Sequence, residues 1–278
     1  MTINCKGQLI DLARPKVMGI LNVTPDSFYD GGKYKSDSAV LAQVEKMLSE
    51  GATFIDVGAY SSRPGASHIS EEEELKRIVK MVERILEKFP EALLSIDTFR
   101  SKVATACLQA GAAIINDISA GNLDGNMLDT IAKFQVPYIM MHMRGTPQTM
   151  LEETHYDNVT KEVCLYFSKK IALARAKKLN DIIIDPGFGF SKTLPQNYSL
   201  LSHLELLHSL RAPLLVGISR KSMVYKLLGT DPENALNGTT ALHTVALLKG
   251  AQILRAHDVK EAMECIKIIA EIKNQNGI

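Results

Sequence analysis

Short apolar runs alternate along this chain with longer segments in which apolar residues recur at helical spacing. The clearest run, at 182–184, consists of three isoleucines and is followed by Asp185, a proline and a glycine. An apolar β-branched run of this kind predicts a short strand buried on both faces. A carboxylate at the end of such a strand is costly without a partner. Asp185 is therefore a candidate pocket floor, and we expect Phe188 and Phe190 of the following loop to lie over it.

Comparable runs recur at regular intervals and predict a set of buried strands. The predicted strands are 17–21, 54–57, 93–96, 113–116, 138–141, 182–185, 214–217 and 253–255. Each is followed by a segment with helical periodicity, the last from about 259 to 273. Residues 3–12 alternate weakly and predict a small strand or hairpin. Ser70 and Glu73 form a predicted capping box, and the acidic run 71–74 is then explained by the positive end of a helix dipole.

Alternating strands and helices imply a parallel sheet, and eight such units in 278 residues fit a closed (β/α)8 barrel. We therefore predict an α/β protein, a TIM barrel, with residues 1–278 forming one domain. A doubly wound open sheet is the alternative. It normally carries a glycine-rich phosphate turn after its first strand, whereas this chain has Asn-Val-Thr-Pro at 22–25.

Composition narrows the class of protein. The chain is 46% hydrophobic and 23% charged, with a net charge of +1, so no overall field attracts nucleic acid or an acidic membrane surface. No apolar run approaches the roughly 18 residues of a membrane span, and no signal peptide is expected. The four cysteines are far apart and predict reduced core thiols in a cytoplasmic protein.

Polar residues follow every predicted strand. In a barrel the active site lies at the carboxyl ends of the strands, so these residues share one rim. They are Asn22, Asp56, Ser61, Ser62, Arg63, Asp97, Asn116, Asp117, His142, Arg144, Asp185, Ser219, Lys221, Arg255 and His257. For Asp56, as a loop cap, and for His142, as a hydrogen-bonded core histidine, a structural role is the favoured interpretation.

Asp97, Asn116 and Asp185 together offer two carboxylates and an amide on neighbouring strands. Carboxylates accept hydrogen bonds and an amide both donates and accepts, which suits a flat heterocycle with several N–H groups and a carbonyl. These three residues therefore predict the floor of a heterocycle site.

A second group of residues is cationic: Arg63, Lys221, Arg255 and His257. Loops after the last strands of a barrel often bind phosphate, and the arginine fork matches phosphate oxygens. Asn22 offers a neutral oxygen, which suits a magnesium ion that keeps most of its waters and shares the phosphates of a substrate. The pattern predicts an anionic leaving group bound at the rim.

Motifs for a strong enzyme nucleophile are missing. The sequence has no Cys–His arrangement, GxSxG, HExxH or P-loop lysine motif. Displacement of diphosphate by a weakly basic, neutral amine needs no such group and is consistent with the residues present.

Seven segments, in order, carry a resemblance to a known family. They are 17–28 (VMGILNVTPDSF), 61–65 (SSRPG), 95–98 (SIDT), 115–118 (INDI), 185–190 (DPGFGF), 217–222 (GISRKS) and 255–259 (RAHDV). Over about residues 15–260 the chain resembles the dihydropteroate synthases. The resemblance implies a (β/α)8 barrel that is usually a homodimer through its C-terminal helices. It implies condensation of hydroxymethyl-dihydropterin diphosphate with para-aminobenzoate to dihydropteroate, with release of diphosphate, in folate biosynthesis.

The same resemblance implies roles for matching positions. The pterin is expected at Asp97, Asn116, Asp185 and Lys221, the magnesium ion (Mg²⁺) at Asn22, and the diphosphate at Asn22, Arg63, Arg255 and His257. The para-aminobenzoate pocket, where sulfonamides compete, is expected at Ser62, Pro64, Phe190, Ser219 and Lys221. The expected catalytic set is Arg63, Asp97, Asp185, Lys221, Arg255 and His257.

The second loop departs from the family pattern. Ala59 replaces a glycine, Tyr60 a glutamate and Ser62 a threonine, which puts loop packing and drug affinity in question more than the reaction. Two alternatives share the floor: a corrinoid-dependent methyltetrahydrofolate methyltransferase and a non-catalytic pterin-binding paralogue. The methyltransferase does not need the Arg255 and His257 rim, and a paralogue typically loses loop residues. An unspecified phosphate-binding barrel would explain the rim but not the floor.

Overall fold

The computed structural model describes residues 1–23, 37–60 and 69–275. Its central feature is an eight-stranded parallel sheet in the order β8-β7-β6-β5-β4-β3-β10-β9. The strands are β3 (Lys16–Asn22), β4 (Phe54–Gly58), β5 (Leu93–Asp97), β6 (Ile114–Asp117), β7 (Tyr138–Met141), β8 (Ile182–Asp185), β9 (Leu215–Val216) and β10 (Ile253–Ala256). A parallel bridge between Ile184 and Leu214 joins the two outer strands, so the sheet closes. The predicted barrel is confirmed, and the open-sheet alternative is wrong.

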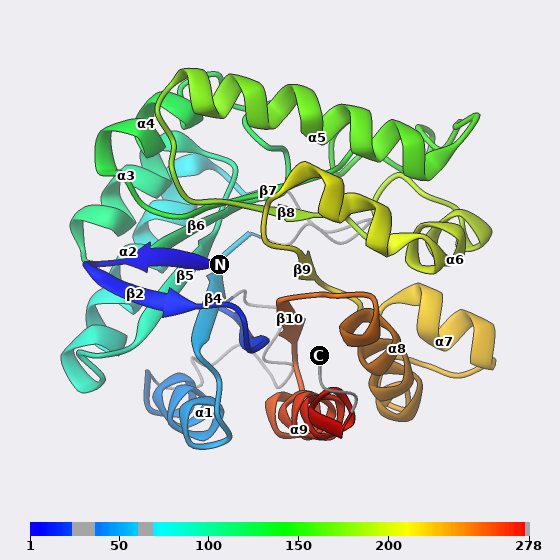
Figure 1. The fold of residues 1–278 in the computed structure, drawn as a ribbon. Helices are drawn as coiled ribbons and strands as arrows, with labels where there is room; N and C mark the ends of the chain where they lie inside the picture. Colours follow the sequence, from blue (N-terminus) through cyan, green and yellow to red (C-terminus); the bar gives the residue numbers. More distant parts are fainter. Residues whose placement is uncertain (24–36, 61–68, 276–278) are drawn as a thin grey trace.

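Helices surround the barrel (Figure 1). They are α1 (Asp37–Ser49), α2 (Glu71–Lys88), α3 (Ser101–Gln109), α4 (Met127–Phe134), α5 (Val159–Ala176), α6 (Leu194–Ser202), the 3-10 segment η2 (Leu204–Leu210), α7 (Ser222–Leu228), α8 (Leu236–Leu248) and α9 (Val259–Gln275). Their apolar faces pack on outward-facing strand residues such as Val57 and Ile96 in one large core cluster. The strand predicted at 214–217 is shorter than expected: β9 spans Leu215–Val216, and the Leu214 N–H donates to the Gln252 side chain at 2.8 Å.

A hairpin covers one end of the barrel (Figure 1). It pairs β1 (Thr2–Cys5) with β2 (Gln8–Asp11), as the weak alternation of 3–12 predicted. Ile3, Cys5 and Ile10 pack against inward-facing residues at the start of the strands, among them Phe54 and Ile183. The hairpin therefore seals the amino-terminal end of the barrel, and a site must use the other end.

The acidic start of α2 is only partly explained by the helix dipole. Ser70 caps the helix by accepting a hydrogen bond from the Glu73 backbone N–H at 3.1 Å, but the Glu73 side chain pairs with Arg77. Glu74 is fully buried, which the sequence interpretation missed. It accepts from Thr98 Oγ1 at 2.7 Å and from Arg100 Nη1 at 2.5 Å. This buried ion pair ties α2 to the segment that follows β5.

All four cysteines are free thiols, as predicted. Burial raises the pKa of Cys5 and of Cys107 to about 12, so neither is a nucleophile at neutral pH. In the part of the chain that the structure describes, no helix is both long and apolar enough to cross a membrane.

We expect Glu74→Gln to lower the free energy of unfolding by about 3 kcal/mol, because it leaves the guanidinium of Arg100 buried without its carboxylate. Urea denaturation measures this change. Glu72→Gln is the matched control, since Glu72 is exposed on the same turn of α2. A loss below about 1 kcal/mol for Glu74→Gln would contradict a stabilising role for the pair.

Candidate active site

The period-2 alternation of the strands builds the site. Residues that face the barrel interior form an apolar layer near the hairpin, including Phe54, Ile114, Ile183 and Ile253. Two residues further along each strand, the same face carries a polar side chain. These polar residues are Asp56, Asn116, Asp185 and Arg255, and Asp97 lies four residues beyond Leu93 on β5. The strand register pairs Asp97 with Asn116, so they lie side by side.

Arg255 forms ion pairs with two carboxylates of this polar layer. Its Nε donates to Asp56 Oδ2 at 2.6 Å, and its Nη2 donates to Asp97 Oδ2 at 2.8 Å. The Asn116 amide nitrogen also donates to Asp56 Oδ2, at 3.0 Å. Asp56 is fully buried and does not cap a loop, so that expectation was wrong. Its structural role is to hold Arg255 and Asn116 in place.

Burial and these contacts shift the pKa values of Asp97 and Arg255. Burial raises the pKa of Asp97 to about 7, with Asp56 adding to the rise and Arg255 opposing it. Burial disfavours the charged guanidinium, yet Asp56 and Asp97 outweigh it and raise the pKa of Arg255. The layer therefore holds one permanent cation between two carboxylates, of which Asp97 titrates near neutral pH.

Two glycines leave room beside the carboxylates. A Cβ at Gly58 would lie 3.4 Å from Asp97 Cβ and 3.8 Å from Asn22 Oδ1. A Cβ at Gly217 would lie 3.7 Å from both Asp185 Oδ2 and Lys221 Nζ. Gly58 therefore lies beside Asp97 and Asn22, and Gly217 lies beside Asp185 and Lys221.

Asp185 is buried, and its carboxylate is held by the loop that follows β8. Its Oδ1 accepts from the Gly187 N–H at 2.8 Å. Burial raises the pKa of Asp185, against the attraction of Lys221, and burial lowers the pKa of Lys221 to about 8, against Asp185. Lys221 Nζ donates to Phe188 O at 2.7 Å and lies 4.7 Å from the centre of the Phe190 ring.

The two phenylalanines of this loop have different positions. Phe190 is half-buried and packs on a methionine-rich cluster with Met141, Met143 and Met150. Phe188 is fully buried in the core between the barrel and its helices, so the expectation that it covers Asp185 was wrong. The turn Gly187–Phe190 therefore places the Phe188 ring in the core between barrel and helices and the Phe190 ring at the rim.

The loops after β9 and β10 are joined. Ser219 Oγ lies 3.0 Å from His257 Nδ1 and accepts from the His257 backbone N–H at 3.1 Å. Arg220 makes a bidentate ion pair with Asp258 at 2.8 and 2.9 Å. These contacts fix Ser219 and His257 side by side.

Several predicted residues are not part of this cluster. Ser61, Ser62, Arg63 and Pro64 lie outside the described residues. Arg144 pairs with Glu162 on α5, away from the polar layer.

His142 and Asp117 are structural. The His142 Nδ1 lies 3.0 Å from Lys192 Nζ, and burial lowers the pKa of His142 to about 2, so its ring stays neutral as a core histidine. Asp117 faces away from the barrel interior and accepts from Tyr138 Oη at 2.6 Å.

Sequence reasoning named Asp56 among the rim residues but did not foresee its pairing with Arg255, and it missed Lys192 altogether. The position of Asp56, two residues beyond the inward-facing Phe54, was a signal that its side chain faces the barrel interior and not a loop. Lys192 is only 6% exposed, and burial lowers its pKa to about 7, with Asp185 opposing the change. A lysine in a loop gives no sequence signal for such burial.

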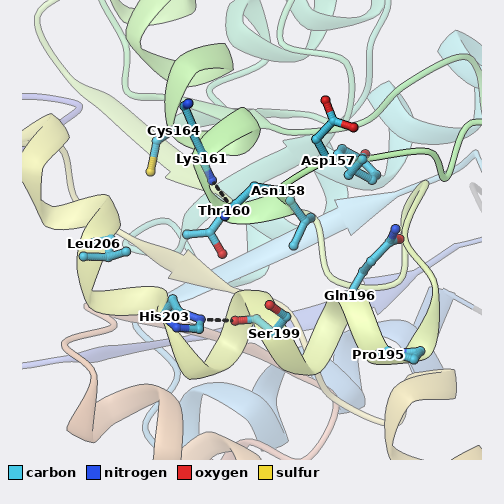
Figure 2. A pocket seen from close by; sticks show the side chains of 12 residues that line it. Asp157, Asn158, Thr160, Lys161, Cys164, Pro195, Gln196, Ser199, His203 and Leu206 are labelled. Carbon is cyan, nitrogen blue, oxygen red and sulfur yellow. Dashed lines mark hydrogen bonds between the residues drawn. The ribbon is translucent and has the colours of Figure 1, made fainter.

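A groove of about 550 Å³ lies outside the barrel, between the start of α5 and helix α6 (Figure 2). Its polar groups serve the local backbone: Asn158 caps α5 by accepting from Lys161 N at 2.9 Å, and His203 Nδ1 lies 2.9 Å from Ser199 O. Its lining includes none of the predicted site residues. The chemistry therefore belongs to the barrel mouth and not to this groove.

Comparisons with known proteins point to one family. Residues 18–257 match the family model described as "Pterin binding enzyme". The chain is 44% identical to the dihydropteroate synthase of Escherichia coli K12 over 271 residues, which covers 97% of this chain and 95% of that protein. The structure of Yersinia pestis dihydropteroate synthase in complex with a sulfonamide drug matches with a TM-score of 0.93 and 44% identity over 99% of this chain and 100% of that chain. Xanthomonas albilineans dihydropteroate synthase with 4-aminobenzoic acid matches with a TM-score of 0.91 and 38% identity over 98% of each chain.

The raised pKa of Asp97 predicts a pH dependence of stability. Between the unfolded value near 3.8 and the folded value of about 7, the folded protein binds more protons. The free energy of unfolding therefore falls as pH rises through this window. We expect Asp97→Asn to reduce this fall by about 2–4 kcal/mol, measured by urea denaturation between pH 5 and pH 7.5. Exposed Asp129 provides the control, Asp129→Asn, and equal slopes for wild type and Asp97→Asn would exclude this titration.

Proposed function

The chain belongs to the dihydropteroate synthase family, and we propose how its residues carry out the family's reaction. The enzyme condenses hydroxymethyl-dihydropterin diphosphate with para-aminobenzoate to give dihydropteroate and diphosphate, in folate biosynthesis. It is thus a transferase of the pterin methylene group. The observation that carries the assignment of roles is the meeting of Asp97, Asn116, Asp185 and Arg255 at the carboxyl ends of four strands.

The floor is assigned to the pterin ring. The amide nitrogen of Asn116 donates to Asp56, so we assign its carbonyl oxygen to an N–H group of the ligand. Asp185 uses Oδ1 for the Gly187 backbone, so Oδ2, beside Gly217, is assigned to the ring. Asp97 keeps Oδ1 for the ring while Oδ2 stays on Arg255. Lys221 completes this group from the loop after β9.

The rim is assigned to the diphosphate. Asp56 and Asp97 use Nε and Nη2 of Arg255, so Nη1 is assigned to a phosphate oxygen. Ser219 engages Nδ1 of His257, and we assign Nε2 to the same anion. Arg63 is assigned to the rim as well, from outside the described residues. Donors in these positions would stabilise the charge that develops on the leaving group.

The aminobenzoate is placed against Phe190, Ser219 and Lys221, with Ser62 and Pro64 of the second loop as further contacts. The Lys221 ammonium, 4.7 Å above the Phe190 ring, provides a positive charge for the carboxylate of the substrate beside an aromatic wall. We expect sulfonamides to compete for this pocket.

In the proposed mechanism the bond between the pterin methylene carbon and the diphosphate oxygen breaks, and the bonding electron pair leaves with diphosphate. The aminobenzoate nitrogen, neutral at pH 7, forms the new bond to carbon and then loses a proton to water or to diphosphate. Asp97 and Asp185 favour positive charge on the pterin ring, so bond breaking runs ahead of attack. No enzyme nucleophile is required.

We propose Mg²⁺ as the cofactor. The described residues contain no group of three or more His, Cys, Asp or Glu side chains that could hold a metal ion. Magnesium suits such a site, because it keeps several waters and uses few protein oxygens together with substrate phosphates. Asn22, whose Oδ1 lies beside Gly58 and Asp97, is the residue assigned to it. When bound, the ion would neutralise charge on the diphosphate.

Three further properties stay proposals: a single domain over 1–278, a homodimer through the C-terminal helices, and a cytoplasmic location. Exposed leucines on α7 and α8, including Leu227, Leu228 and Leu248, support a dimer surface there.

The purified protein is expected to release diphosphate from the pterin substrate in the presence of Mg²⁺ only when para-aminobenzoate is added, with dihydropteroate as product. Phosphate-coupled detection and chromatography measure both. Tight binding of the pterin diphosphate without product would instead indicate the non-catalytic paralogue. Absence of binding would overturn the assignment of floor and rim.

Asp185→Asn is expected to weaken binding of the pterin diphosphate by about 2–3 kcal/mol, because ring N–H groups lose a charged acceptor. Isothermal titration calorimetry measures the affinity. Asp157→Asn, an exposed substitution in the outer groove, is the control. Unchanged affinity in Asp185→Asn would remove Asp185 from the pterin floor.

A further inference from the structure

Lys192 lies behind the loop that carries Phe190 and has no role in the mechanism above. Its side chain is buried, and its Nζ lies 3.0 Å from each of three acceptors: Gly187 O, Phe190 O and His142 Nδ1. In its ammonium form Lys192 has three N–H bonds, one for each of these acceptors. A buried amino group that is hydrogen-bonded to three acceptors restricts the positions of these partners.

The loop that Lys192 holds has an unusual backbone. Gly187, Gly189 and Ser191 all have positive φ angles, of 70°, 81° and 44°. Positive φ has no steric cost at the two glycines, whereas it is unfavourable for Ser191, which has a side chain. The Phe190 N–H donates to Gly187 O at 3.1 Å, so both carbonyls that accept from Lys192 belong to one tight turn. Lys192 therefore stabilises a turn that its two glycines permit and that Ser191, at the end of it, disfavours.

The third acceptor connects this turn to the barrel. The His142 ring packs edge-on against Tyr166, with 4.7 Å between ring centres, and its backbone N–H donates to Asp185 O at 3.0 Å. A Cβ at Gly187 would lie only 2.1 Å from His142 O, so the turn rests directly on this residue. Through its contact with His142, Lys192 connects the turn to the end of β7.

Asp185 and Phe190 differ in how they are held. Asp185 is the last residue of β8, and the sheet fixes its backbone through His142. Phe190 lies beyond the turn, and its backbone carbonyl is held by Lys192. Loss of Lys192 should therefore move Phe190 more than Asp185.

We propose that Lys192 is a positioning residue for the aminobenzoate pocket, acting through the Gly187–Phe190 turn to set the place of the Phe190 ring. This inference rests on the proposed function, in which Phe190 is a wall of that pocket. Lys192 touches neither substrate and takes no part in bond making.

Lys170 provides a matched control. It is also a partly buried lysine that donates to loop oxygens, at 2.8 Å to Ala120 O and 2.6 Å to Asn122 Oδ1. Its loop follows β6 and does not include the Phe190 turn. Lys170→Met therefore removes a comparable structural tie and should lower stability without changing the KM for either substrate.

The test is steady-state kinetics of Lys192→Met with each substrate varied in turn. We expect the KM for para-aminobenzoate to rise about tenfold, because a small displacement of a pocket wall weakens binding and orientation. The KM for the pterin diphosphate should change less than about threefold. In a double-mutant cycle, Lys192→Met should add no further rise in the aminobenzoate KM to Phe190→Ala.

A purely structural role for Lys192 predicts a different result: a lower melting temperature and less active protein, with both KM values unchanged. That result would overturn the proposal, as would full additivity with Phe190→Ala. If Lys192→Met does not fold, Lys192→Gln retains two N–H donors and should give a smaller rise in the same KM, and an unchanged KM would equally overturn it. Failure of the proposed function is separate, because it would appear as no amine-dependent diphosphate release in the wild-type protein.

Discussion

The active end of this barrel depends on one guanidinium group between the carboxylates of Asp56, which is fully buried, and Asp97, which is partly exposed. Asp56 and Asp97 face the interior from neighbouring strands, where their charges would repel without a cation. Arg255, 199 residues further along the chain from Asp56, supplies that cation from the last strand. The ion pair requires that β10 pairs with β3, so the last strand of the barrel completes the site.

The rest of the site follows from this arrangement. Asp56 fixes Arg255 and Asn116. The Asn116 amide nitrogen and Asp97 Oδ2 are engaged within the protein, so in the proposed assignment the Asn116 carbonyl oxygen and Asp97 Oδ1 accept from the heterocycle. On the opposite side, two lysines hold the carbonyls of the loop after β8: Lys221 binds Phe188 O, and Lys192 binds Gly187 O and Phe190 O. In the proposed assignment, the pterin therefore meets strand residues that are held by ion pairs, and the aminobenzoate meets a loop that is held by lysines.

Much of the fold and part of the site could be predicted from the sequence. Hydrophobic periodicity located all eight barrel strands, because strand and helix periods differ and each strand is short and apolar. The resemblance to dihydropteroate synthases was confirmed by the comparisons. Asp56 and Glu74 were misinterpreted, since their roles depend on Arg255 and Arg100, which local pattern cannot connect to them. Lys192 was missed for the same reason.

The sequence by itself determined the order of strands and helices, the rim on which polar residues gather, and the chemical types present there. These follow from local periodicity and from the rule that parallel strands end at one edge. Only the tertiary structure decided which carboxylate is paired, which lysine is buried, and which phenylalanine enters the core. Burial and pairing are decided by residues that are distant in the chain and meet only after the barrel closes, and the energies of buried charges depend on those neighbours.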